Sequence, residues 1–285
     1  MNNEFYIGWL PKAPEVFAKH VKKTLLILLP VVIITGVILA LLQKKFDTGN
    51  FEYGILTEVK GVYFDKPVPM IKVINGKDIW GNLSYISILL VGYGKHGADG
   101  IISDIEKEKN ISLNEKEITL KGTLFYNDGK TIMQVSANEK PVVAIAANKI
   151  DESLLSQRKN LGNIKVKGEI IDPKCYFGVM KPGEGKVHRD CAIRCILGGI
   201  PPVMLVRNAK GERNYYLIVG PNGEKMNEAV QDYVAEPVEL DAQLIQCDDW
   251  IVMYVKDIKT INRISGLSLL KNDEDIFCCG GNGNR

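Results

Sequence analysis

One stretch of the chain gathers the side chains that could do metal or redox chemistry. Cys175, His188, Cys191 and Cys195 occur there with the spacing C-x12-H-x2-C-x3-C. The pattern over 187–197 predicts a short helix, and positions i, i+3 and i+7 of a helix share one face. His188, Cys191 and Cys195 would therefore lie together, and Cys175, at the end of the preceding predicted strand, could close over them. We predict a Cys3His metal site with these four ligands.

The type of metal and the use of the thiols stay open. Thiolate and imidazole ligands suit zinc, copper or iron. Alternatively, Cys175 could form a structural disulfide with Cys191 or Cys195, as is common in exported domains. A third possibility is a thiol oxidoreductase, although C-x3-C differs from the usual C-x-x-C. We find no hydrolase motif and assign no catalytic residue, so an accessory or binding protein is favoured over an enzyme.

A membrane anchor precedes this stretch. Residues 24–42 are an uncharged apolar run, long enough at about 1.5 Å per residue to cross a hydrocarbon core of roughly 30 Å. No small-x-small cleavage pattern follows, which favours an uncleaved anchor over 24–43 rather than a signal peptide. More lysines precede the run than follow it, so the positive-inside rule places residues 1–23 in the cytoplasm. We expect a single-pass protein of the cytoplasmic membrane whose bulk lies in the periplasm or outside the cell.

The rest of the chain predicts a mainly β protein built from a duplicated unit. Short apolar runs alternate with Gly-rich turns, which is typical of strands. Three groups of residues recur in the same order in the second half of the chain. Residues 59–61 with Asp65 match residues 166–168 with Asp172, and residues 90–94 match residues 218–223. The third group matches position by position: Leu124, Asp128, Met133 and Val135 correspond to Leu244, Asp248, Met253 and Val255. We therefore expect two related OB-like small β-barrels, or sandwiches.

The repeat sets the expected domain boundaries. The first β domain covers 44–141, a linker 142–160, the second β domain 161–268 and a mobile tail 269–285. The second copy is longer between its first two matched groups, and the Cys/His stretch lies in that gap. We therefore predict that residues 173–202 are an insertion carried by one copy, which is where functional loops often lie.

The Cys/His stretch also carries a resemblance. Residues 172–180, 182–185, 188–195 and 198–202 resemble a motif of bacterial exported or membrane-anchored proteins that form an uncharacterised family. The segment 5–9 before a single apolar helix is similar to some of them. The resemblance implies a bacterial source and a location outside the cytoplasm, and it supplies no activity.

Together these features predict the partners and the role. The lipid bilayer would be bound through residues 24–43, and a membrane or envelope complex, plausibly respiratory, would be served by the metal or redox centre. The formal net charge of +2 is close to balance and indicates no nucleic-acid partner. The competing hypothesis is a structural or interaction module whose insertion is held by a disulfide.

Overall fold

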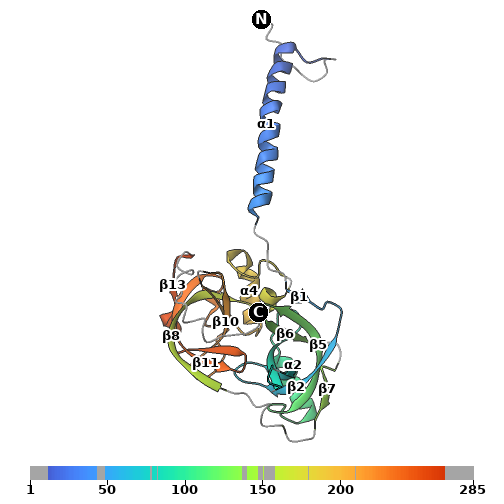
Figure 1. Cartoon of the computed structure of the whole chain (residues 1–285), viewed down its shortest axis with the longest axis vertical. Coiled ribbons are helices and arrows are strands. Elements are labelled where there is room, and N and C mark those ends of the chain that lie inside the picture. The colour runs from blue at the N-terminus through green and yellow to red at the C-terminus, as the bar shows by residue number, and fades with distance from the viewer. Residues whose placement is uncertain are drawn as a thin grey trace. The chain divides into compact units, whose positions relative to one another are not determined.

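The computed structural model describes residues 12–43, 49–77, 79–81, 83–136, 140–146, 150, 158–178, 180–208 and 210–266, and it divides into two compact units, Met1–Asp47 and Thr48–Arg285. The first unit contains helix α1, Glu15–Leu42 (Figure 1). None of its side chains is buried, and the helix is long and apolar enough to span a membrane or to be a signal sequence. The predicted apolar run is thus helical, and the helix begins upstream of it.

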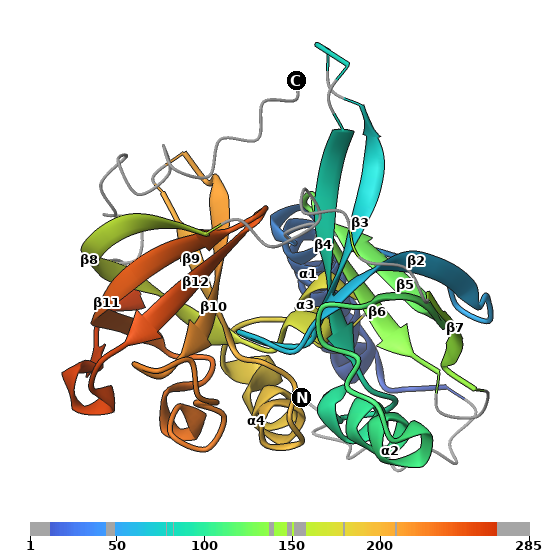
Figure 2. The ribbon, with the colours of Figure 1, turned by 90° about the horizontal axis from the view of Figure 1, so that it is seen from below.

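The second unit confirms the predicted fold class, because it consists of two closed five-stranded mixed β-barrels (Figure 2). The first barrel is built from β2 Thr57–Phe64, β3 Met70–Lys77, β4 Leu83–Val91, β5 Glu117–Asn127 and β6 Lys130–Val135, with helix α2 Asp99–Lys109 and the short strands β1 Asn50–Phe51 and β7 Val142–Ile145. The second is built from β8 Arg158–Ile171, β9 Val203–Arg207, β10 Arg213–Val219, β11 Pro237–Cys247 and β12 Trp250–Val255, with the short strand β13 Asn262–Arg263.

The two barrels share one topology. In each, three strands form an antiparallel meander, and a helical or turn-rich connection leads to an antiparallel hairpin. The last strand of the hairpin runs parallel to the third strand, as β6 does beside β4 and β12 beside β10. The hairpin's first strand closes the barrel by pairing with the opening strand, as β5 with β2 and β11 with β8. This is the five-stranded arrangement of OB-like barrels.

Strand register confirms the duplication seen in the sequence. Leu124 pairs with Met133 in the first barrel, and the matching Leu244 pairs with Met253 in the second. The parallel pairs agree as well, because Leu90 lies opposite Met133 and Ile218 opposite Met253. The repeated residues therefore occupy equivalent places in the two barrels.

The Cys/His stretch lies at one connection of the second barrel. Residues 65–69 join β2 to β3, whereas residues 172–202 join the equivalent strands β8 and β9. The longer connection contains helix α3 Pro173–Phe177, the 3-10 turn η2 Lys186–His188 and helix α4 Arg189–Leu197. The β8–β9 connection is therefore much longer than the equivalent connection of the first barrel.

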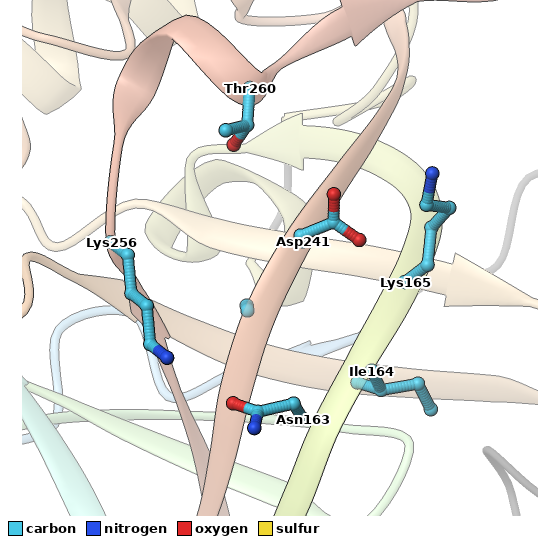
Figure 3. A pocket seen from close by; sticks show the side chains of 7 residues that line it. Asn163, Ile164, Lys165, Asp241, Lys256 and Thr260 are labelled. Atoms are coloured by element: carbon cyan, nitrogen blue, oxygen red, sulfur yellow. The ribbon is translucent and has the colours of Figure 1, made fainter.

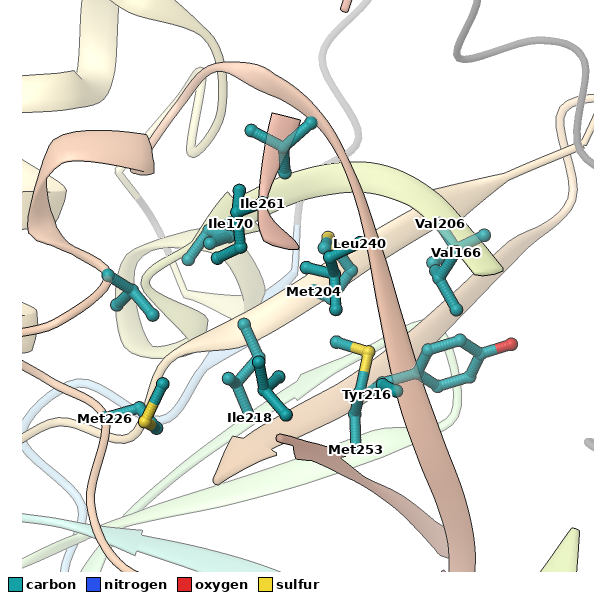
Figure 4. Close-up of a cluster of buried hydrophobic side chains, with 14 of the residues drawn as sticks. Val166, Ile170, Met204, Val206, Tyr216, Ile218, Met226, Leu240, Met253 and Ile261 are labelled. Carbon is teal, nitrogen blue, oxygen red and sulfur yellow. The ribbon is translucent and has the colours of Figure 1, made fainter. Parts of the chain in front are cut away.

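Buried apolar side chains form three clusters. One cluster fills the first barrel and another fills the second (Figure 4). The third is formed by side chains from both barrels. Leu89 and Leu217, on the equivalent strands β4 and β10, belong to the shared cluster, while their neighbours Leu90 and Ile218 point into the barrels. Both faces of these strands are buried, which explains why their sequences read as unbroken apolar runs.

The polar contacts between the barrels are related by the repeat. The β5–β6 turn of the first barrel reaches Tyr215 on β10, whose hydroxyl donates to Asp128 at 2.5 Å. The β11–β12 turn of the second barrel reaches Ser87 on β4, whose amide donates to Asp249 at 2.8 Å. Because Ser87 and Tyr215 are equivalent positions, the barrels meet in a pseudo-two-fold manner.

The residues around the predicted linker belong partly to the barrels. Val142 is buried, and its strand β7 pairs with β5 of the first barrel, while β8 begins at Arg158. All of β7 and the first residues of β8 therefore fall within the predicted linker 142–160. The predicted tail 269–285 lies outside the described residues.

Candidate metal site

Helix α3 positions Cys175. Strand β8 ends at Ile171, and Asp172 caps the helix by accepting a hydrogen bond from the Lys174 amide at 2.9 Å. Pro173 follows as the first helical residue, a position where its missing N–H costs nothing. The expectation that Cys175 ends the preceding strand is therefore wrong, because this Asp-Pro start turns the chain into a helix before Cys175 is reached.

Aromatic packing fixes α3 between the barrels. Phe177 is fully buried in the shared cluster, with its ring centroid 4.7 Å from that of Tyr215 and 6.5 Å from that of Trp250. Tyr176 is also buried and lies edge-on to Phe177. The apolar residues after Cys175 thus hold its thiol in place.

Helix α4 positions the other predicted ligands. The helix predicted over 187–197 is present as η2 followed by α4, with His188 at the N-cap and Gly198 at the C-cap. Gly199 adopts a φ of +102°, a backbone conformation that favours glycine, and ends the helix. His188 and Cys195 are buried and Cys191 is half-buried.

The structure brings the predicted ligands together in two overlapping groups. Cys175, His188 and Cys191 have ligand atoms within 4.8 Å of one another, and so do Asp172, Cys175 and Cys195. The Sγ atoms of Cys175 and Cys191 are 4.0 Å apart. The cluster of four predicted residues could hold a metal ion, and Asp172 is a potential ligand that the sequence analysis used only as a repeat marker.

Two buried polar atoms of the cluster are not hydrogen-bonded. His188 Nε2 and Asp172 Oδ2 have no hydrogen-bond partner among the described residues. Asp172 is fully buried, and His188 is 6% exposed. A buried polar atom without a partner costs about 1–3 kcal/mol, so both atoms are better satisfied when a cation or donor lies between the two helices.

The protonation states of the apo cluster follow from its burial. A hydrogen bond with Cys195 and burial raise the pKa of the Cys175 thiol far above its usual range. Burial lowers the pKa of His188, which keeps the imidazole neutral at neutral pH and able to bind a metal. Metal binding at Cys175 would therefore release a proton.

The first barrel also reaches the cluster, through the loop 92–98 between β4 and α2. Lys95 Nζ lies 3.1 Å from Cys191 Sγ, and this hydrogen bond raises the pKa of Lys95. Lys174 of α3 donates to the carbonyl oxygens of Gly92 and Gly94 at 2.7 and 2.6 Å. Lys95 could not be assigned to the cluster from the sequence, because no local pattern relates this loop to a helix almost a hundred residues later.

The thiols of the described residues are free. Cys175, Cys191, Cys195 and Cys247 form no disulfide, and the 4.0 Å between Cys175 and Cys191 is well beyond an S–S bond of about 2.05 Å. Cys247 is buried in the shared cluster at the end of β11, away from the inserted helices in the sequence.

A separate surface pocket lies on the second barrel (Figure 3). Its lining comes from β8, β11 and the residues after β12, namely Asn163, Ile164, Lys165, Asp241, Ala242, Lys256 and Thr260. These side chains carry both signs of charge and include no thiol or imidazole, so the pocket does not extend the metal cluster.

Comparison with models of known protein families gave no match, and searches of curated proteins and of solved structures gave none either.

Proposed function

We propose that this chain is a membrane-anchored bacterial protein that holds a soft transition-metal ion outside the cytoplasm, and that it serves as an accessory or assembly component of an envelope complex. Zinc, copper and iron all suit its thiolate and imidazole donors. The resemblance of the inserted segment to that of bacterial membrane-anchored proteins supports the location.

One observation carries the metal-binding proposal. His188 Nε2 and Asp172 Oδ2 are buried without a hydrogen-bond partner, and both residues stand beside the thiol of Cys175. Buried polar groups in folded proteins are almost always satisfied. A cation bound beside the Cys175 thiol satisfies the unpartnered atom of the group that holds it, His188 Nε2 in one group and Asp172 Oδ2 in the other, whereas a disulfide from Cys175 to Cys191 or Cys195 supplies a partner to neither atom.

Helix α1 supports the anchor. Its exposed apolar surface needs lipid, and the same length and composition suit a signal sequence. Mass spectrometry of the mature protein from a membrane fraction separates the two roles. We expect the chain to retain residues 1–43, and a mature chain that begins beyond residue 43 would contradict the anchor.

Metal analysis tests the site. The full chain should be purified in detergent without a polyhistidine tag and analysed by inductively coupled plasma mass spectrometry together with a thiol count. We expect at least one zinc, copper or iron ion per chain, and a large loss of metal in His188→Gln and Cys191→Ser.

Cys247→Ser is the matched control, because Cys247 is a buried free thiol that belongs to neither group of candidate ligands. Its metal content should equal that of the wild type. Metal-free wild-type protein with a bridged Cys175 would overturn the proposal and favour the alternative of a disulfide-stapled interaction module.

A further inference from the structure

The donors of the cluster number five rather than the four predicted, and they separate into two triads. The outer triad is Cys175, His188 and Cys191, and the inner triad is Asp172, Cys175 and Cys195. Cys175 belongs to both. The inner triad is the more deeply buried, since all three of its residues are buried, while Cys191 of the outer triad is half-buried.

Both triads approach the size of a metal site, since the donor atoms of each lie within 4.8 Å of one another. In the outer triad the Cys175 and Cys191 sulfurs are 4.0 Å apart, and three donor atoms with that spacing lie about 2.3 Å from their common centre, which is the zinc–thiolate bond length. Cys195 groups with Asp172 rather than with His188 and Cys191. A single ion in the outer triad therefore leaves Cys195 and Asp172 unused.

Asp172 gives independent support for an inner ion. Its Oδ1 atom caps α3, while Oδ2 is fully buried and has no hydrogen-bond partner among the described residues. Asp172 and Cys175 lie three positions apart at the start of α3, and Cys191 and Cys195 lie four positions apart on α4. Residues with this spacing share one face of a helix, so each helix presents its two donors on a single face.

We propose that the cluster binds two divalent transition-metal ions bridged by the thiolate of Cys175, one in each triad. This inference rests on the proposed metal-binding function and adds the number of ions, the bridging ligand and the role of Asp172. Each ion then has three protein donors and keeps a fourth position open for an exogenous ligand, as zinc sites with three protein ligands do.

The test is a count of ions. The full chain, stripped of metal in detergent under reducing and anaerobic conditions, should be titrated with zinc chloride and measured by native mass spectrometry. We expect two zinc ions per wild-type chain. Asp172→Asn and Cys195→Ser should each retain one ion, His188→Gln should also retain one, and Cys247→Ser should retain two.

Cobalt(II) gives a second readout that does not depend on variants. The sulfur-to-cobalt charge-transfer absorption of the wild-type chain should rise until two equivalents are added. Saturation at one equivalent, with one zinc ion in the wild type and unchanged binding in Asp172→Asn, would overturn the two-ion inference and leave the proposed function standing. Binding of no ion at all would overturn both.

Discussion

Asp248 and Asp128 occupy equivalent turn positions, yet they meet different partners across the barrels. Asp248 forms a 2.8 Å ion pair with Lys72, whose side chain is 3% exposed, while Asp128 accepts from the hydroxyl of Tyr215. Both residues have a positive φ, near 55° and 47°, which asparagine tolerates. Replacement by asparagine therefore tests the charge with little change to the turn.

We predict that Asp248→Asn lowers the free energy of unfolding by about 3–5 kcal/mol, because it removes the carboxylate partner of a buried ammonium. Asp128→Asn should cost less, about 1 kcal/mol, since the amide oxygen can still accept from Tyr215. Urea denaturation of both variants measures the difference. Equal losses would mean that the buried ion pair of Asp248 contributes no more than the hydrogen bond from Tyr215 to Asp128.

Glu169 on β8 gives the stability of the second barrel a pH dependence. Its side chain is buried and accepts from the Gly185 amide, and burial raises the pKa of this carboxyl above its ordinary value of 4.5. Between the ordinary and the raised pKa, the folded protein binds more protons than the unfolded chain. Stability therefore falls as the pH rises through this window.

We predict that Glu169→Gln, which does not titrate, removes this decline and is more stable than the wild type above the window. Urea midpoints measured from pH 4 to pH 8 test this, with Glu58→Gln on the exposed side of β2 as the control. Parallel curves for the wild type and Glu169→Gln would contradict the assignment.

Among the elements, the contact between the loop 92–98 and α4 brings the first barrel to the Cys/His cluster. The amide of Gly97 donates to the carbonyl of Gly198 at 3.0 Å, and a Cβ atom added at Gly198 would lie 1.8 Å from the carbonyl oxygen of Lys95. No side chain fits between these backbones.

We predict that Gly198→Ala forces the loop away from α4, lowers the free energy of unfolding by about 1–3 kcal/mol and speeds the loss of bound zinc to a chelator. Gly100→Ala is the control, because an added Cβ there meets no atom within 4 Å. Thermal denaturation and the chelation rate report the two effects. A Gly198→Ala protein with wild-type behaviour in both would show that the loop contact has no role at the site.

The elements that could be predicted from sequence are those with a local signal. The apolar run of α1, the repeated strands and the helix that carries Cys191 and Cys195 all have a periodicity that fixes their type. Asp172 and Lys95 could not be assigned to the site in this way. Their positions depend on an N-cap and on an inter-barrel contact, and neither leaves a periodic pattern.

At the scale of the whole molecule, the two barrels share a core. The cluster that contains Leu89, Leu217, Phe177 and Trp250 draws side chains from both, and ion pairs cross the same interface. Separating the barrels would expose a continuous apolar surface, so neither barrel should be stable when the other unfolds.

We predict a single unfolding transition for the residues after α1. Trp250, fully buried between the barrels, reports the interface by fluorescence, and far-ultraviolet circular dichroism reports the strands of both barrels. Coincident denaturant curves are expected from the two probes. A fluorescence change at lower urea than the loss of strands would instead show barrels that part before they unfold.

The pseudo-two-fold interface has a consequence for how far the two halves can differ. Lys130 and Trp250 are equivalent positions, and in this protein they face each other, with the Lys130 ammonium 4.7 Å from the centre of the Trp250 ring. A homodimer of single barrels would place lysine against lysine or tryptophan against tryptophan at this point. Two barrels in one chain are free of that identity, so one half can carry the inserted Cys/His cluster while the other supplies Lys95 beside it.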